Sequence, residues 1–365
     1  MVQLIDEVPR ARMFHKEYPC LSFDSDVTCE HFASVARELL GAELLGPDPF
    51  AVEIGCDDGV MLQAISDAGV RHLKVDPSRR AADAAADKGI DVLVDFFEES
   101  SALAIREKHG PADVIFSANT TSHIAYIDSI LSGVAVLLAP DGVFVIEDPY
   151  LADIIEHNYF DQVYDEHFYL FSAHSVANTA ARFGLELIDA RRLPVHGGSV
   201  RYTLARVGAR PQSPALLEVL AGEREAKLDE QSTFHEFAAD IGRIGADLVT
   251  LLEELRAAGQ RVAGYGATSR SSTITNFLGI GPELISYISD STPEKQGRLT
   301  PGSHIPIVPP EVFTDPYPDY AVLFAWNHAE EIMAKERAFT EQGGKWILYV
   351  PDVHIVGHGE YTAAA

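Results

Sequence analysis

Apolar residues follow two different spacings along this chain, and their alternation predicts a wound α/β protein. Beyond a short tail, helical spacing predicts an amphipathic helix from apolar residues at 32, 35, 36, 39 and 40. Short apolar runs then predict strands, separated by helical segments, at 50–54, 72–75, 92–94, 114–117 and 143–146. Because strands that alternate with helices form parallel sheets with crossover helices, this half of the chain predicts a Rossmann-like α/β domain.

The second half predicts another Rossmann-like α/β unit. Apolar runs at 185–188 and 200–204 predict an antiparallel pair that closes the first sheet, and Pro-Gln-Ser-Pro at 211–214 marks a boundary. A long helix is predicted over 234–255, and four further strands follow at 262–265, 284–289, 320–326 and 346–350. We therefore expect a tail, a first Rossmann-like domain, linking helices and a C-terminal α/β domain, at 1–27, 28–210, 211–260 and 261–365.

Composition narrows the class of protein. With 365 residues the chain is long enough for two cores, and its 28 basic and 55 acidic residues give a net charge of −27, which disfavours nucleic acid as a partner. No apolar run reaches the roughly 20 residues needed to cross a bilayer, and the N-terminus lacks the apolar core of a signal peptide. We expect a cytoplasmic protein, monomeric or homodimeric, without membrane partners. The cysteines at 20, 29 and 56 are too irregularly spaced for disulfides or a metal site.

The first strand-to-helix turn carries glycines and acids in a pattern suited to a cationic ligand. Gly55 and Gly59 give the spacing G-x-x-x-G, not the G-x-G-x-x-G of dinucleotide-binding turns. Glu53 and Asp57 would repel a pyrophosphate, whereas they suit the sulfonium and amino groups of S-adenosylmethionine (SAM). The turn therefore predicts a SAM-binding domain over residues 28–210.

The ends of the next strands add to this set. Asp76 closes the second strand, where an acid commonly binds a ribose diol. Asp95 and Phe96 follow the third strand and offer a carboxylate and a ring to the adenine, and Asn119 follows the fourth. One such feature at each successive strand end favours SAM over an ordinary turn with solvated acids.

Several longer motifs carry a family resemblance. They stand at 117–123 (SANTTSH), 164–169 (YDEHFY), 196–201 (HGGSVR), 264–268 (GYGAT), 275–277 (TNF), 290–298 (DSTPEKQGR), 301–306 (PGSHIP) and 325–327 (AWN). With them the sequence resembles the nucleotide-sugar C-methyltransferases of deoxysugar and antibiotic biosynthesis, from roughly residue 29 to residue 351. The resemblance implies SAM-dependent methylation at C3 of a dTDP-4-keto sugar. It also implies catalytic roles for Tyr164, Glu166, His167 and His123.

The chemistry of carbon methylation agrees with these assignments. A carbanion equivalent forms when a base removes the acidic proton beside a ketone, and His167 is the expected base because its ordinary pKa is near neutral. His123 or Tyr164 would donate a hydrogen bond to the developing enolate oxygen. Glu166 would orient the base or hold a sugar hydroxyl.

The substrate would be held by a further set of residues. Arg201, Lys295 and Arg298 are expected at the diphosphate, because cationic side chains bind phosphate oxygens. The sugar or nucleotide is expected to contact His196, Ser199, Tyr265 and His304.

The sequence departs from the family pattern in three places. The family usually opens with a zinc-binding module of C-x-x-C pairs; none is found here, so we expect no structural zinc. Where the family places a catalytic tyrosine ahead of the first helix, this chain reads YPCLSF at 18–23, and the equivalent is undefined or replaced. Relatives often carry Gly-Lys-Ser where this chain has Ser-Arg-Ser at 269–271, which keeps the positive charge.

Two other activities remain open from the sequence. Gly264-Tyr265-Gly266 resembles half of a dinucleotide fingerprint, which allows a bifunctional enzyme that also reduces the 4-ketone with NADPH. The third glycine is missing, however, and the alternative is that this turn binds the substrate's nucleotide diphosphate. The second activity is O- or N-methylation of a finished natural product, which needs a base but no group that stabilises an enolate.

Overall fold

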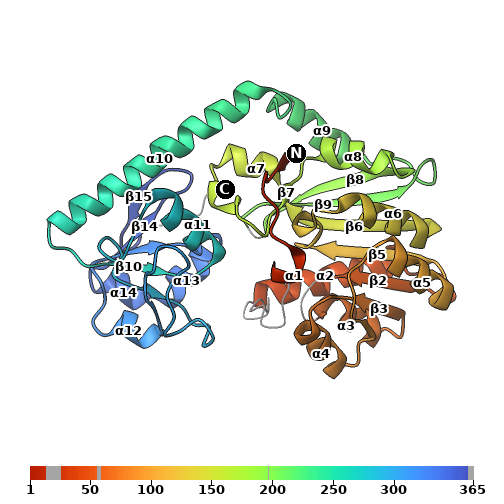
Figure 1. Ribbon diagram of the computed structural model, residues 1–365, viewed down its shortest axis with the longest axis horizontal. Coiled ribbons are helices and arrows are strands. Elements are labelled where there is room, and N and C mark those ends of the chain that lie inside the picture. The colour runs from red at the N-terminus through yellow and green to blue at the C-terminus, as the bar shows by residue number, and fades with distance from the viewer. Residues whose placement is uncertain (14–25, 56–58, 196, 361–365) are drawn as a thin grey trace. The chain divides into compact units, whose positions relative to one another are not determined.

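The computed structural model describes residues 1–13, 26–55, 59–195 and 197–360. The chain forms two compact units (Figure 1). The first unit comprises Met1–Ala152 and Asp165–Asp229, and the second comprises Asp153–Tyr164 and Glu230–Ala365.

The first unit contains a seven-stranded sheet in the order β4-β3-β2-β5-β6-β9-β8. Its strands are β2 (Phe50–Ile54), β3 (Arg71–Val75), β4 (Val92–Leu93), β5 (Ala112–Ala118), β6 (Leu138–Pro149), β8 (Leu185–Leu193) and β9 (Ser199–Arg206). The neighbouring pairs β4–β3, β3–β2, β2–β5 and β5–β6 are parallel, whereas β9 pairs antiparallel with both β6 and β8. The predicted antiparallel closure of the first sheet is therefore confirmed.

Helices cover both faces of this sheet because its central strands are apolar on both sides. The covering helices are α2 (Asp26–Ala42), α3 (Val60–Asp67), α4 (Arg79–Asp87), α5 (Glu99–His109), α6 (Ile127–Leu137), α8 (Ala173–Ala181) and α9 (Pro214–Glu225), and the short α1 (Arg10–Met13) precedes them in the chain. All five residues of β2 are buried. Phe50, Val52 and Ile54 enter the core with α5 and α6, while Ala51 enters the core with α2 and α3. This alternation is what a strand between two helical layers requires.

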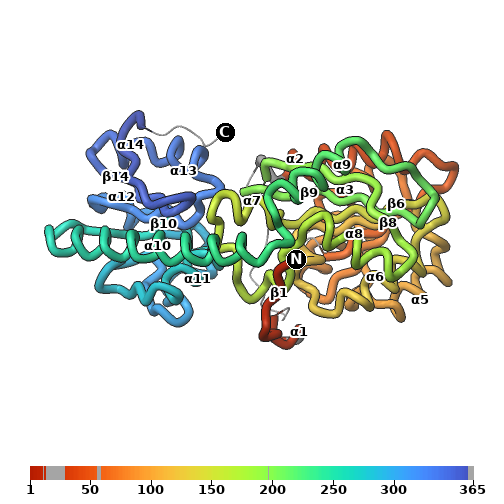
Figure 2. The backbone as a smooth tube through the Cα atoms, turned by 90° about the horizontal axis from the view of Figure 1, so that it is seen from above, coloured from red at the N-terminus to blue at the C-terminus, as the bar shows by residue number. Residues whose placement is uncertain are grey.

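The second unit contains a six-stranded sheet in the order β12-β11-β10-β13-β14-β15. Its elements are α10 (Gln231–Ala257), β10 (Val262–Tyr265), α11 (Ser269–Leu278), β11 (Ile288–Ser289), β12 (Ile307–Val308), α12 (Pro310–Thr314), β13 (Tyr320–Leu323), α13 (Ala329–Lys335), α14 (Arg337–Glu341), β14 (Lys345–Leu348) and β15 (His354–Val356). All pairs are parallel except β14–β15. Figure 2 shows α10 as one continuous helix, as its long apolar face predicts.

Two predicted strands lack three or more of their expected residues in the structure. The strand predicted at 284–289 begins only at Ile288, because the amides of Leu284 and Ile285 both donate to the carbonyl of Gly281 in a turn. The strand predicted at 320–326 ends at Leu323, and a 3₁₀ turn, η3 (Trp326–His328), follows it.

The compact units divide the chain differently from the predicted limits. Residues 153–164, which hold most of α7 (Leu151–Glu156) and the 3₁₀ turn η2 (Phe160–Gln162), cluster with the second unit. The helix α9, predicted within the linking segment, clusters with the first unit.

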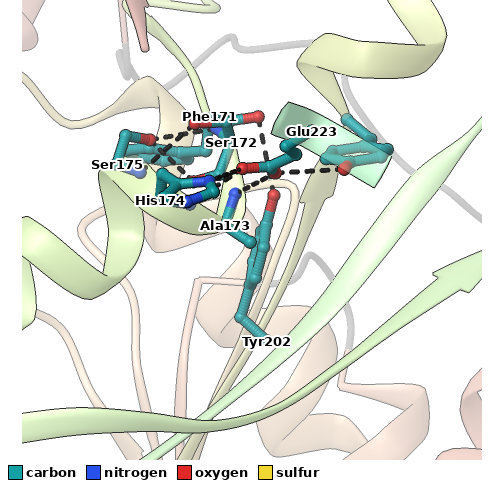
Figure 3. A network of polar contacts seen from close by, with 8 residues as sticks. Phe171, Ser172, Ala173, His174, Ser175, Tyr202 and Glu223 are labelled. Carbon is teal, nitrogen blue, oxygen red and sulfur yellow. Dashed lines mark hydrogen bonds and ion pairs between the residues drawn. The ribbon is translucent and has the colours of Figure 1, made fainter. Parts of the chain in front are cut away.

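A buried carboxylate explains the attachment of α9 to the first unit (Figure 3). Glu223 accepts a hydrogen bond from the Tyr150 hydroxyl at 3.0 Å. It also accepts the amides of Ala173 and His174, at 2.5 and 3.0 Å. The His174 ring lies 2.6 Å from the same carboxylate. Because those two amides open α8, where the helix dipole is positive, the Glu223 carboxylate stabilises that helix end and fixes α9 against it.

Candidate active site

The first sheet changes winding direction between β2 and β5. The chain builds β3 and β4 on one side of β2, then β5 and β6 on the other. Open parallel sheets bind ligands at such a point, beyond the carboxyl ends of the strands. The two loops that meet there pack tightly, since a Cβ added to Gly55 would lie 2.5 Å from the Thr120 hydroxyl oxygen. Gly55 and Gly59 both have left-handed φ, at 71° and 76°.

Buried charges surround this turn. Glu53 and Asp76 are only 1% and 5% exposed. The wholly buried Lys74 donates from Nζ to the Gly55 carbonyl at 2.9 Å, and the same Nζ lies 3.4 Å from an Asp76 carboxylate oxygen. Burial raises the pKa of Asp76, against the opposing effects of Lys74 and of the Ser78 amide. Sequence reasoning missed Lys74, whose only signal was a lysine inside an apolar strand.

The other predicted cofactor residues lie at neighbouring strand ends. Asp95 is exposed and accepts the Phe96 amide at 2.8 Å, while the Phe96 ring is half-buried. Asn119 has a left-handed φ of 45° and donates its amide to the Glu147 carbonyl at 2.7 Å. Asp57 lies outside the described residues, as does the predicted substrate residue His196.

Two of the predicted catalytic side chains come together. His123 ends the 3₁₀ turn η1 (Thr121–His123) after β5, and the buried His167 precedes β7 (Tyr169–Leu170). Their rings stack with centroids 5.3 Å apart at an angle of 29°. Desolvation lowers the pKa of His123 to about 4, so its ring is neutral at physiological pH.

Asp148, an acid that sequence reasoning missed, holds the 3₁₀ turn η1 that ends at His123. Asp148, at the end of β6, accepts the Ser122 hydroxyl at 2.7 Å and the Ser122 amide at 3.2 Å. Burial raises the pKa of Asp148 to about 7. A second contact, 2.8 Å between the Ser117 and Thr121 hydroxyls, ties the turn to β5. The signal in the sequence was the pair Glu147-Asp148 at the end of an apolar strand.

Tyr164 and Glu166 are the other two predicted catalytic residues of the YDEHFY motif. The Glu166 carbonyl accepts the Phe168 amide at 3.0 Å, and Glu166 and Tyr164 are both half-buried. Tyr164 is the last residue of the segment that clusters with the second unit. The catalytic roles of Tyr164 and Glu166 stay predictions.

Arg201 lies among carboxylates. Its Nε donates to Glu147 at 2.5 Å and its Nη1 to Glu38 at 2.6 Å, while the His31 ring lies 2.7 Å from Glu147. Ser199 is buried on the same strand and donates to the Val195 carbonyl at 3.2 Å. The ion pairs give Arg201 a structural function in the first unit, and its predicted contact with a diphosphate is untested.

The second sheet also changes winding direction, between β10 and β13. Thr268 caps α11 there by accepting the Ser271 amide at 3.2 Å. The Arg270 guanidinium lies 4.7 Å from the centre of a Trp326 ring and donates to the side-chain oxygen of Asn327. Sequence reasoning noted the charge of Arg270 but not its aromatic partner.

The predicted substrate residues of the second unit are spread around this edge. The Tyr265 hydroxyl donates to Glu336 at 2.8 Å, and burial together with this carboxylate raises the pKa of Tyr265. Lys295 lies 3.5 Å from Asp290, whereas Arg298 and His304 are exposed. Within the described residues, no group of three or more histidines, cysteines or acids is placed to hold a metal ion. In that same part of the chain no helix has the length and apolarity to cross a membrane.

Comparisons with known proteins agree with this architecture. A model described as a methyltransferase domain matches residues 30–190, and one described as a C-methyltransferase C-terminal domain matches residues 194–351. The C-methyltransferase NovU of Streptomyces niveus is 38% identical over 306 residues, which cover 84% of this chain and 73% of that protein. A ubiquinone biosynthesis O-methyltransferase of a Methylobacterium species is 28% identical over 149 residues, covering 38% of this chain and 55% of that one.

Among solved structures, a SAM-dependent methyltransferase from Anabaena variabilis is similar, with a TM-score of 0.40 and 18% identity over 50% of this chain and 86% of that one. The match to the methyltransferase domain and the strand order together give the first unit the Rossmann-like fold of class I SAM-dependent methyltransferases, and a second unit with a mixed sheet follows it. None of these similarities supports NADPH as a second cofactor.

Proposed function

This chain belongs to the C-methyltransferase family, and on that premise we propose that it methylates C3 of a dTDP-4-keto-deoxysugar with SAM, through an enolate. The observation that carries the proposal is the stacked pair His123–His167, in which His123 ends the short turn capped by Thr120, the residue that packs on Gly55. A base and a neutral hydrogen-bond donor side by side are what deprotonation next to a ketone needs.

The turn of the first unit fits the cofactor. Left-handed glycines allow the backbone to approach a ligand, and added Cβ atoms at Gly55 and Gly59 would collide with Thr120 and Ile90 at 2.5 and 2.7 Å. The buried carboxylates of Glu53 and Asp76 favour a ligand that carries positive charge and a ribose. We assign Phe96 and Asp95 to the adenine. When bound, SAM supplies an electrophilic methyl group on its sulfonium.

The two histidines divide the proton chemistry. His167 accepts the C3 proton on a ring nitrogen, and the C3–H electron pair becomes part of the enolate. Neutral His123 then donates a ring N–H to the enolate oxygen at C4. A protonated His123 would repel the imidazolium that forms on His167. Because the pKa of His123 is lowered to about 4, His123 stays neutral and the His167 ring can accept the proton.

We assign the nucleotide end of the substrate to the second unit. A helix N-terminus and an arginine together favour an anion, and Arg270 lies at the start of α11. The Trp326 ring beside it is itself stacked on Tyr159 with centroids 4.1 Å apart. This aromatic and cationic surface suits a nucleoside diphosphate, with Lys295 and Arg298 as further cations.

The proposal is tested by incubating the protein with SAM and a dTDP-4-keto-2,6-dideoxy sugar in deuterated water, followed by mass spectrometry. We expect a methyl gain that requires SAM, and deuterium exchange at C3 that continues without SAM and is lost in His167→Gln. Methylation of the 4-hydroxy sugar at an equal rate would instead indicate O-methylation, because that substrate cannot form the enolate. No methyl gain across several such sugars, despite SAM binding, would contradict the assigned substrate class.

A further inference from the structure

The first thirteen residues form an arm on the first unit. Its strand β1 (Val2–Gln3) pairs antiparallel with β7, and the Leu4 amide donates to the Phe168 carbonyl at 3.0 Å. Phe168 directly follows the candidate base His167. The arm is therefore hydrogen-bonded to the backbone that carries this base.

Arg10 ties the other end of the arm to two aromatic rings. Its guanidinium carbon lies 4.3 Å from the centre of the Phe96 ring and 4.8 Å from that of Tyr126, and it also forms an ion pair with Glu98. Both distances are within the roughly 6 Å over which a cation attracts an aromatic face. The two rings meet edge to face, 6.5 Å apart. One side chain thus fixes the relative position of a residue assigned to the adenine and of a residue in the loop after His123.

A small cavity lies between the arm and that loop. Glu7, Arg10 and Met13 line it from the arm, and the opposite wall is formed by His123, Tyr126 and Phe168. The arm therefore covers the face of the site where His123 lies.

We propose that this arm positions the active site, with Arg10 holding Phe96 and Tyr126 for the cofactor's adenine while the arm shields His123 from water. The inference rests on the proposed function, since it assigns the adenine to Phe96. Arg10 acts through the two rings and is a positioning residue, not a catalytic one.

We also expect the arm to influence the charge of His123, because arm residues and this ring line the same cavity. His167 stacks on this ring, and the titratable or charged residues Glu7, Arg10 and Tyr126 line the same cavity as His123. Removing the arm would admit water to the ring, and water favours the protonated form. Without the arm, the pKa of His123 should rise from about 4 toward its ordinary value of 6.5.

The test measures binding of S-adenosylhomocysteine (SAH) by calorimetry to the full chain, to Arg10→Ala and to Arg10→Lys. Arg12→Ala is the matched control, because Arg12 is an exposed cation on the same short helix. We expect Arg10→Ala to bind SAH about three- to tenfold more weakly, through the lost cation–aromatic contacts, and Arg10→Lys to recover part of the loss. Arg12→Ala should bind as the wild-type protein does.

Hydrogen exchange separates positioning from a purely structural effect. Coupling between two sites is reciprocal, so SAH should slow exchange in residues 1–13 of the wild-type protein and of Arg12→Ala, but not in Arg10→Ala. Unchanged SAH affinity in Arg10→Ala, or an equal loss in Arg12→Ala, would overturn the role of the arm and leave the proposed function standing. A wild-type protein that does not bind SAH would overturn both.

Discussion

The turn after β2 and the turn after β10 occupy the same place in their two sheets, yet different charged side chains surround them. Each follows a strand beside the point where winding changes direction, and each contains a left-handed glycine, Gly55 with φ 71° and Gly266 with φ 87°. Around the first turn lie the buried acids Glu53 and Asp76 together with the buried Lys74. Around the second lie the cation Arg270 and the buried acid Asp290.

The acid after the next strand makes the difference clearer. Asp76 and Asp290 each accept an amide two residues ahead at 2.8 Å, from Ser78 and Thr292. Asp290 uses its other oxygen to accept the Ala267 amide of the glycine turn, also at 2.8 Å. Both oxygens of Asp290 thus accept backbone amides, whereas among the described residues the second oxygen of Asp76 has only the Lys74 amine at 3.4 Å. Asp290 therefore has less capacity left to accept a ribose diol than Asp76 has, which weakens the case for a nicotinamide cofactor. The two equivalent turns thus differ in which charged side chains remain available to a ligand, and the proposed function assigns them ligands of opposite charge.

The largest effect should come from removing the base. We expect His167→Gln to lower kcat by about 10²–10⁴-fold, the usual contribution of a general base. Binding of SAH and of dTDP, measured by calorimetry, should stay within about threefold of wild type, because neither turn is altered. A large loss of dTDP affinity would contradict the assignment of the base to the first unit and of the nucleotide end of the substrate to the second.

Arg270→Ala should weaken binding of the anionic ligand. We expect the KM for the nucleotide sugar and the Kd for dTDP to rise about tenfold or more, since a charge-assisted hydrogen bond contributes roughly 1.5–3 kcal/mol. The measurements are steady-state kinetics and calorimetry, with SAH affinity as the internal reference. Arg256→Ala, an exposed cation at the end of α10, is the control and should leave dTDP binding unchanged. Equal losses in both variants would point to a general charge effect.

A matched pair of glycine substitutions sharpens the comparison. Alanine at either left-handed position costs about 1 kcal/mol of backbone strain. The added methyl would lie 2.5 Å from Thr120 in Gly55→Ala and 3.0 Å from Ala325 in Gly266→Ala. We expect Gly55→Ala to weaken SAH binding about tenfold and spare dTDP, and Gly266→Ala to do the reverse to a smaller extent. Identical ligand profiles for the two variants would contradict separate sites.

Sequence reasoning located the two turns but not the contacts around them. Strands β2 and β10 were predicted with the bounds they have, because apolar runs that end at glycines are local signals. The family resemblance implied catalytic roles for both His123 and His167, but their stacking was not predicted, since the residues lie on separate loops. Lys74 and Asp148 were missed as parts of the site. A charge inside an apolar strand shows its function only when its partners fold around it.

The smallest effect concerns Asp148, the buried acid beside the first turn. Its pKa is raised from 3.8 to about 7 in the folded protein, so the native state binds more protons than the unfolded chain between these values. Folding stability must therefore fall as pH rises through this window and level off above it. Between about pH 6 and about pH 8 the loss should be roughly 1 kcal/mol, measured by urea unfolding. Asp148→Asn should lose this slope, because its amide does not titrate, whereas Asp141→Asn, exposed on the same strand, should keep it. A slope retained in Asp148→Asn would show that another group produces it, and that the turn carrying His123 is held by Asp148 in its ionised form.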